Sequence, residues 1–199
     1  MHLIEIWGYC AEGKHRILVY EYLEQGSLAE NLYCNVIDWK KRFQIALGMA
    51  KGLAYLHEEY LEWVLHCDVK PENILLDSNY QPKVADFGFS KLLKRVDVDV
   101  YSYGMVLLEM VTGRSPKTHI QTFGAGGKVA EKGLVEWVRE MVKGDAEMTS
   151  WIDEILDPLM GNTQCDKGKM ALLVRIALQC VEEDRNVSPT MRQVVEMLL

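Results

Sequence analysis

The spacing of hydrophobic and polar residues changes once along the chain, near residue 38. Before this point, Leu3–Cys10 and Arg16–Tyr22 are rich in β-branched and aromatic residues and flank a polar turn, which predicts two β-strands. After it, Asp38 provides an N-cap, and apolar residues recur at helical spacing as far as about His57. Two strands followed by a mass of helices are typical of an α+β protein that is mostly α.

The later segments continue this pattern. The short apolar runs Ile74–Leu76 and Lys83–Ala85 predict a hairpin that turns at Ser78 and Asn79. Residues 100–112 are apolar almost all round and stop at Gly113, which predicts a buried helix with a C′ glycine. Residues 114–130 are interpreted as a glycine-containing loop. Four helices are predicted after it: Leu134–Lys143, Ser150–Leu156, Lys167–Glu182 and Thr190–Leu199, the last with Ser188 as N-cap and Pro189 at N1.

Composition and charge exclude several classes of protein. Hydrophobic residues make up 49% of the chain and charged residues 26%, as in a soluble globular domain. The net charge of −7 argues against a nucleic-acid partner, and the basic runs 40–42 and 91–95 are interpreted as solvated faces. No apolar run approaches the roughly 18 residues of a membrane span, and the N-terminus lacks a signal-peptide profile. Five scattered cysteines without a C-x-x-C pair favour reduced thiols in the cytosol and argue against a zinc site.

Two short motifs carry the chemistry. The block HCDVKPEN, residues 66–73, is followed after twelve further residues by DFG, residues 86–88. Phosphoryl transfer needs a carboxylate to orient a hydroxyl, a cation near the transferred group and two oxygen ligands for Mg²⁺, and the motifs contain all of these. They match the protein-kinase catalytic loop H-R-D-L-x-x-x-N at His, Asp and Asn, and the D-F-G motif follows in the required order.

Two other catalytic motifs are rejected. The segment GAGGK, residues 124–128, resembles a P-loop, but Thr122 and Val129 occupy the places that require Gly and Ser or Thr. A Cys–His nucleophile formed by His66 and Cys67 is disfavoured, because adjacent residues rarely face each other in an extended loop.

With these motifs the chain resembles plant receptor-like serine/threonine kinases, especially the G-type lectin S-receptor-like group. The likeness covers nearly the whole chain, through VYEYLEQGSL, KGLAYLHEE, LEWVLHCDVKPENILLD, KVADFG, DVYSYGMVLLEMVTG and CVEEDRN..PTM. The Lys-Pro after Asp68 fits Ser/Thr specificity. Cys67 replaces the usual Arg, as in non-RD kinases, so a phosphate on the activation loop would have no bidentate partner here.

The resemblance implies a protein-kinase-like fold. Residues 38–199 would form the helical C-lobe, and residues 1–37 a two-strand remnant of the N-lobe, the hinge and the start of the C-lobe. It implies ATP and Mg²⁺ as cofactors, and a protein substrate or signalling partner. It also implies a place on the cytoplasmic side of the plasma membrane, although the chain alone would be cytosolic.

Roles follow for the residues that match the family motifs. Asp68 would accept the proton of the substrate hydroxyl, Lys70 would steady the γ-phosphate, and Asn73 and Asp86 would hold Mg²⁺. At the adenine, Tyr20 resembles the gatekeeper. The remaining assignments are the hinge backbone at Glu21 and Leu23, the floor beneath the base at Leu75, the anchor of the catalytic loop at Asp99, and a structural His66 beneath Phe87.

The chain also departs from the family pattern. It begins where the family's fourth strand begins, so the glycine-rich loop, the β3 Lys and the αC Glu are not in this sequence. Only ten residues separate Gly88 from Asp99, and no Ala-Pro-Glu triplet is present. Ser188 replaces the Arg that pairs with the glutamate of that triplet. These departures fit a truncated or mis-spliced product, or a degenerated gene.

Two hypotheses therefore stay open. The first is an ATP-dependent serine/threonine protein kinase. The second is a catalytically inactive, pseudokinase-like binding module. In both, residues 3–22 are expected to be the least stable part of the chain, because two strands in isolation are marginal.

Overall fold

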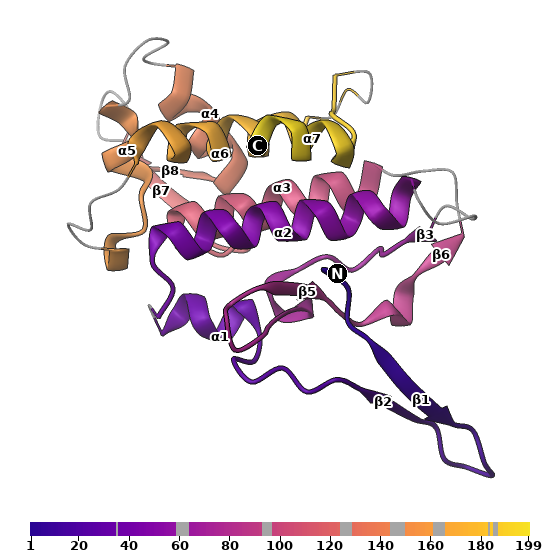
Figure 1. Ribbon diagram of the computed structural model, residues 1–199. Helices are drawn as coiled ribbons and strands as arrows, with labels where there is room; N and C mark the ends of the chain where they lie inside the picture. Colours follow the sequence, from indigo (N-terminus) through magenta and orange to yellow (C-terminus); the bar gives the residue numbers. More distant parts are fainter. Residues whose placement is uncertain are drawn as a thin grey trace.

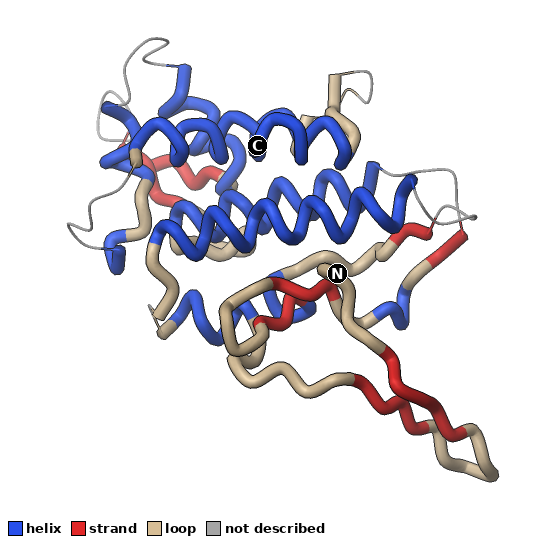
Figure 2. Tube along the Cα trace, viewed as in Figure 1, coloured by secondary structure: helices blue, strands red, loops and turns tan. Residues whose placement is uncertain are grey.

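A helical body with one projecting hairpin makes up the protein (Figure 1). The computed structural model describes residues 1–34, 36–58, 64–92, 97–123, 129–143, 150–160, 166–182, 184 and 187–199. Helices form most of the body, and the strands are short (Figure 2). This arrangement confirms the prediction of a mostly helical α+β protein with small two-stranded sheets.

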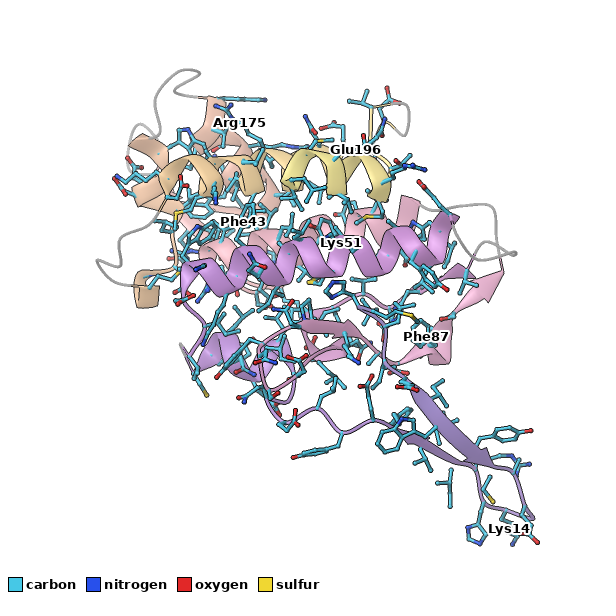
Figure 3. The ribbon with its side chains drawn as sticks, viewed as in Figure 1. Lys14, Phe43, Lys51, Phe87, Arg175 and Glu196 are labelled. Carbon is cyan, nitrogen blue, oxygen red and sulfur yellow. The ribbon has the colours of Figure 1, made fainter. Side chains whose placement is uncertain are left out.

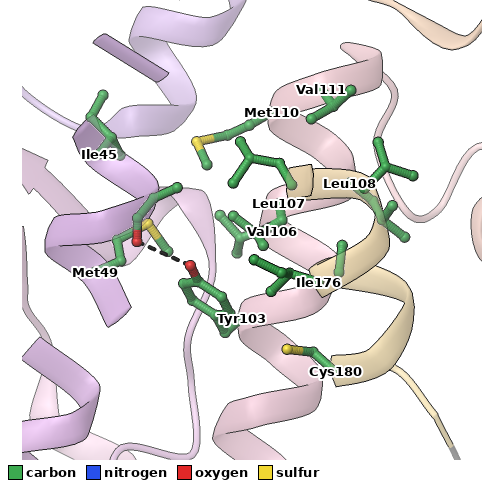
Figure 4. Close-up of a cluster of buried hydrophobic side chains, with 14 of the residues drawn as sticks. Ile45, Met49, Tyr103, Val106, Leu107, Leu108, Met110, Val111, Ile176 and Cys180 are labelled. Atoms are coloured by element: carbon green, nitrogen blue, oxygen red, sulfur yellow. Dashed lines mark hydrogen bonds between the residues drawn. The ribbon is translucent and has the colours of Figure 1, made fainter. Parts of the chain in front are cut away.

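Four helices form the core of the body. They are α2 (Trp39–Glu58), α3 (Asp97–Thr112), α6 (Lys167–Cys180) and α7 (Met191–Leu198), with α3 packed against α6 and α2 against α7. Their buried side chains meet around α3, where the Tyr103 hydroxyl donates to the Ala46 carbonyl at 3.0 Å (Figure 4). A Cβ at Gly104 would lie 2.8 Å from the Cys180 Cβ, so the close approach of α3 to α6 depends on this glycine.

Shorter helices cover the ends of this core. They are α1 (Leu28–Tyr33), α4 (Leu134–Lys143), α5 (Ser150–Ile155) and the 3₁₀ turns η1 (Pro71–Asn73), η2 (Phe87–Phe89) and η3 (Pro158–Met160). A capping box starts α1, since Ser27 and Glu30 each accept the other's backbone N–H. Because α1 packs against η1 and β4, it supports the segment that carries the kinase-like motif.

The described structure contains four two-stranded antiparallel sheets. They pair β1 (Ile6–Cys10) with β2 (Ile17–Tyr20), β3 (Val64–Leu65) with β6 (Lys91–Leu92), β4 (Ile74–Leu76) with β5 (Pro82–Val84), and β7 (Ile120–Phe123) with β8 (Val129–Lys132). The β4–β5 hairpin confirms the predicted turn at Ser78 and Asn79. The proposed division of the chain at residue 38 stays a prediction.

The element boundaries predicted from the sequence agree closely with those of the structure, with three corrections. Asp38 caps α2 as predicted, because its carboxylate accepts the Lys41 N–H at 2.8 Å. The buried helix begins at Asp97 rather than at residue 100. The loop predicted at 114–130 is wrong in part, because strands β7 and β8 lie within or overlap it; they are held by pairing with each other, which a short local pattern does not reveal. The N-cap of α7 is Thr190, which forms a capping box with Gln193, and not Ser188.

The interpretation of residues 40–42 as a solvated face is wrong for Arg42. Its side chain is fully buried, and its Nη2 donates to the Asp157 carboxylate at 2.8 Å. Its Nε donates to the Ile37 carbonyl at 3.3 Å, and its Nη1 donates to the Met110 carbonyl. Arg42 thus joins α2 to the end of α3 and to the segment after α5.

Candidate active site

The catalytic-loop residues are fixed from below by Asp99, near the start of α3. Its buried carboxylate accepts the backbone N–H of His66 through Oδ2 and that of Cys67 through Oδ1, both at 2.7 Å. The Nε2 of the buried His57 lies 3.0 Å from the same Oδ2. Cys67 has a positive φ of 64°, a conformation that L-residues rarely adopt without support. The two hydrogen bonds to Asp99 hold the backbone in this turn, as the resemblance implied.

His66 is buried and has a structural role. Its Nε2 lies 2.8 Å from the Ala85 carbonyl, which can only accept, so Nε2 carries a proton. Its Nδ1 accepts the backbone N–H of Asp68 at 3.3 Å. One neutral tautomer satisfies both contacts. The ring meets Phe87 edge-on, with centroids 5.0 Å apart, which confirms the predicted packing of His66 beneath this phenylalanine.

Asp68, Lys70 and Asn73 form one hydrogen-bonded group. The Asp68 Oδ2 accepts from the Lys70 Nζ at 2.7 Å and from the Asn73 Nδ2 at 2.8 Å. The same Asn73 Nδ2 also donates to the Asp68 carbonyl at 2.9 Å. Burial by itself would raise the pKa of Asp68, but the hydrogen bonds from Lys70 and Asn73 lower it below its usual value. The hydrogen bond to Asp68 in turn raises the pKa of Lys70. At neutral pH the pair is therefore a carboxylate beside an ammonium.

Asp86 lies at the end of the β4–β5 hairpin and is exposed. Its backbone is left-handed, with φ 64° and ψ 73°, and its Oδ1 accepts the Gly88 N–H at 3.2 Å. The hairpin is tied to the catalytic loop, because the Ala85 N–H donates to the Asn73 carbonyl at 2.9 Å. The structure therefore connects Asn73 and Asp86 through one backbone hydrogen bond and one intervening residue.

The chemistry of these donors fits a magnesium ion. Both hydrogens of the Asn73 amide are directed at Asp68, so its carbonyl oxygen is left to accept from or coordinate another group. Mg²⁺ prefers oxygen ligands and is usually bound through one or two protein groups plus water and phosphate oxygens. Among the described residues, no group of three or more His, Cys, Asp or Glu side chains could hold a metal ion.

Glu21 and Leu23, the residues predicted as the hinge, follow β2, where the β1–β2 hairpin joins the body. The Glu21 carboxylate binds the Lys83 Nζ, with both oxygens at 2.6 Å, and its backbone N–H donates to the Glu5 carbonyl at 3.0 Å. Partial burial would raise the pKa of Glu21, but the hydrogen bond from Lys83 outweighs it and lowers that pKa. Leu23 is buried, and Leu75 is half-buried on β4. Tyr20, the predicted gatekeeper, is 46% exposed at the end of β2.

Sequence reasoning missed two supports of this site. The helical pattern identifies His57 only as the end of an apolar face, but its side chain lies against Asp99. The strand pattern identifies Lys83 only as part of a hairpin, but its Nζ binds the Glu21 carboxylate. The sequence gives no local signal for either contact, because the partners are 42 and 62 residues away.

Comparison with known proteins agrees with the motifs. The protein kinase domain model matches residues 1–97. A maize (Zea mays) protein named as a receptor protein kinase, ZmPK1, is 44% identical over 232 aligned positions, which cover 100% of this chain and 28% of the relative. The G-type lectin S-receptor-like serine/threonine-protein kinase SD2-5 of Arabidopsis thaliana is 37% identical over 238 positions, covering 100% of this chain and 27% of the relative. The proline-rich receptor-like protein kinase PERK8 of Arabidopsis thaliana is 34% identical, over 99% of this chain and 32% of the relative.

The chain belongs to the protein kinase family. Its similar relatives are plant receptor-like kinases, and it spans between about a quarter and a third of their length. The alignment with the maize kinase runs over 232 positions against 199 residues here, so that relative contains residues without a counterpart in this chain. Among the helices in the described part of the structure, none is both long and apolar enough to cross a membrane.

Proposed function

We propose that Asp68, Lys70, Asn73 and Asp86 form the catalytic site of a serine/threonine protein kinase, which transfers a phosphoryl group from ATP to a protein hydroxyl. The observation that carries the proposal is the shared contact at the Asp68 Oδ2. A cation and an amide meet there on one carboxylate, beside a hairpin that presents a second carboxylate. Phosphoryl transfer requires a carboxylate near the attacking hydroxyl, a cation near the transferred phosphoryl group and oxygen ligands for the metal ion, all close together.

Each side chain has a role that follows from its contacts. The pKa of Asp68 is lowered, so its carboxylate is ionised and only weakly basic. It would therefore accept a hydrogen bond from the substrate hydroxyl and orient it, rather than act as a strong base. Lys70 is cationic and 45% exposed, and it would steady the γ-phosphate. Asn73 and Asp86 provide the oxygens for Mg²⁺, which when bound with ATP neutralises charge on the phosphates. The hinge backbone at Glu21 and Leu23 would contact adenine, and Leu75 would lie beneath it.

A second candidate is a catalytically inactive binding module with the same fold. It is favoured by the short interval of ten residues between Gly88 and Asp99. So few residues leave little chain for a surface that would hold a protein substrate. The alignments, which are longer than the chain, agree with a shortened interior segment.

Mg-ATP binding and phosphoryl transfer, measured separately, distinguish the two candidates. Calorimetric titration with Mg-ATP and a transfer assay with casein and labelled ATP would be run on the native chain, Asp68→Asn and Asp86→Asn. Asp153→Asn, at an exposed surface ion pair, is the matched control. The kinase proposal predicts transfer that both site variants abolish and the control retains. Binding without transfer, weakened by Asp86→Asn, supports the inactive module. Binding that Asp86→Asn leaves unchanged contradicts the site assignment itself.

A further inference from the structure

A side-chain ion pair ties the predicted hinge to β5. Both oxygens of the Glu21 carboxylate lie 2.6 Å from the Lys83 Nζ, and the side chains of Lys83 and Glu21 are only 20% and 16% exposed. The Glu21 Oε1 also accepts the Glu5 N–H at 2.8 Å. One carboxylate therefore satisfies both a cation and a backbone donor, at a place where water and salt screen the charges less than on the open surface.

The β4–β5 register places this pair beside the residue predicted as the floor of the adenine site. Lys83 lies directly opposite Leu75 in the antiparallel ladder. Directly opposed residues have their side chains on one face of a sheet, so Leu75 and Lys83 share the face that Glu21 contacts. Leu75 is half-buried there. The ion pair thus joins the hinge to the pair of residues beside which the base would lie.

The other end of the hinge is fixed by backbone hydrogen bonds. The Gln25 N–H donates to the Leu76 carbonyl at 3.2 Å, and the Leu76 N–H donates to the Gly26 carbonyl at 2.9 Å. Residues 21–26 are therefore attached to the β4–β5 hairpin at both ends, through the backbone of β4 at one end and through the ion pair with β5 at the other.

The two attachments differ in what they require of the sequence. A backbone hydrogen bond is kept by almost any residue, whereas the ion pair needs one acidic and one basic side chain. Glu21 follows β2 directly, and the β1–β2 hairpin leaves the body on the side where Phe87, next to Asp86, is labelled (Figures 1 and 3). The ion pair therefore stands where the projecting hairpin, the hinge and the strand that leads to Asp86 come together.

We propose that Lys83 is a positioning residue for the adenine end of the nucleotide site, because its bond to Glu21 fixes the separation between the hinge backbone and Leu75. Its ammonium is bound by the Glu21 carboxylate, so Lys83 acts through the hinge and not by contact with the base. The inference rests on the proposed nucleotide site but not on phosphoryl transfer. It therefore applies both to an active kinase and to an inactive module that binds ATP.

Calorimetric titration with adenosine and, separately, with Mg-ATP tests this role. Lys83→Met and Glu21→Gln should each raise the Kd of both ligands by roughly tenfold, as expected for the loss of one hydrogen bond between charged groups. Lys83→Arg keeps the cation and should bind both ligands nearly as tightly as the native chain. The double variant, Glu21→Gln with Lys83→Met, should be no weaker than either single variant, because both changes remove the same contact.

Two further variants serve as controls. Lys167→Met removes a surface ion pair, whose Nζ lies 2.7 Å from the Asp153 carboxylate, and should leave both Kd values unchanged. Asp86→Asn changes the proposed metal site and should weaken the binding of Mg-ATP but not that of adenosine. A variant that is partly unfolded would lower the number of binding sites in the titration and not raise the Kd, so the fitted stoichiometry separates positioning from folding.

The possible results separate this role from the proposed function. A native chain that binds neither adenosine nor Mg-ATP overturns the proposed nucleotide site and the role of Lys83 with it. A native chain that binds both, with unchanged Kd values in Lys83→Met, overturns the role of Lys83 alone. So does a loss confined to Mg-ATP, or Mg-ATP binding without adenosine binding, since the proposal places the effect at the adenine end. Additive losses in the double variant would also contradict it.

Discussion

Replacing Asp157 by Asn tests whether the buried contact with Arg42 stabilises the helical body. The two side chains are 0% and 3% exposed and join α2 to the segment after α5 at 2.8 Å. In Asp157→Asn the guanidinium keeps its bonds to the Ile37 and Met110 carbonyls but loses its buried counter-charge. Removing one partner of a buried pair typically costs 3–5 kcal/mol, because the remaining charge stays out of water.

We expect a loss of about 3 kcal/mol, at the lower end of that range, because Asn keeps an oxygen that can accept from Arg42. For a domain of this size, each 1 kcal/mol shifts Tm by roughly 2–4 °C, so Tm should fall by roughly 6–12 °C. Urea denaturation followed by far-UV circular dichroism gives the free energy of unfolding. The m-value should stay unchanged if the unfolding remains a single transition.

The matched control is Asp153→Asn, whose carboxylate binds the Lys167 Nζ at 2.7 Å on the surface. Both side chains of this pair are about half exposed or more, so its loss should change the free energy by less than about 0.5 kcal/mol. Equal stability of the Asp157 and Asp153 variants would refute the view that burial, and not mere proximity, determines the strength of these pairs.

Three further predictions concern other parts of the chain. Burial and the charge of Glu72 raise the pKa of Glu109 from an ordinary 4.5 to about 7. The contribution of this group to the free energy of unfolding is therefore most favourable at low pH and falls as the pH rises from about 4.5 to about 7. Glu109→Gln should therefore gain stability over the native chain in urea denaturation at pH 8 and show little gain near pH 4; an equal gain at both would contradict the assigned pKa. Gly104→Ala should destabilise by about 1–3 kcal/mol in the same assay, since its Cβ would meet α6 at 2.8–2.9 Å, and an unchanged midpoint would disprove this close packing. The segment expected to be least stable, residues 3–22, narrows to residues 6–20, because Leu3 and Ile4 are buried and the Ile4 N–H donates to the Val84 carbonyl. Amide hydrogen exchange should be fast over residues 6–20 and slow over residues 100–111, and equal protection would refute the low stability of the hairpin.

Much of the fold could be predicted because its signals are local. The α2 helix follows from the Asp38 cap and an apolar period that repeats within one segment. The β4–β5 hairpin follows from a turn between two apolar runs. The β7–β8 hairpin was missed, because its strands are held by each other and its sequence resembles a loop. The short helix α1 is not among the predicted helices, although Ser27 and Glu30 have the spacing of a capping box.

The candidate site divides in the same way. Asp68, Lys70 and Asn73 lie within six residues, so the sequence alone indicated that they act together. The contacts that position them are not local: Asp99 is 33 residues from His66, and Lys83 is 62 residues from Glu21. Pairings of this kind depend on how helices and strands pack, and no short pattern encodes them.

The sequence by itself determined the protein-kinase-like character of the chain, the order of its main helices and the residues of its catalytic loop, because these follow from residue types at short spacing. Only the tertiary structure decided which charges are buried and which apolar residues are exposed. Arg42 stands in a basic run beside two lysines but lies in the core, since its acceptors come from segments up to 115 residues away. Tyr9 and Leu18 are residue types that are common in buried strands, but both are exposed to solvent, since the described structure places no other element against them. Burial depends on what packs against a residue, and that is a property of the whole fold.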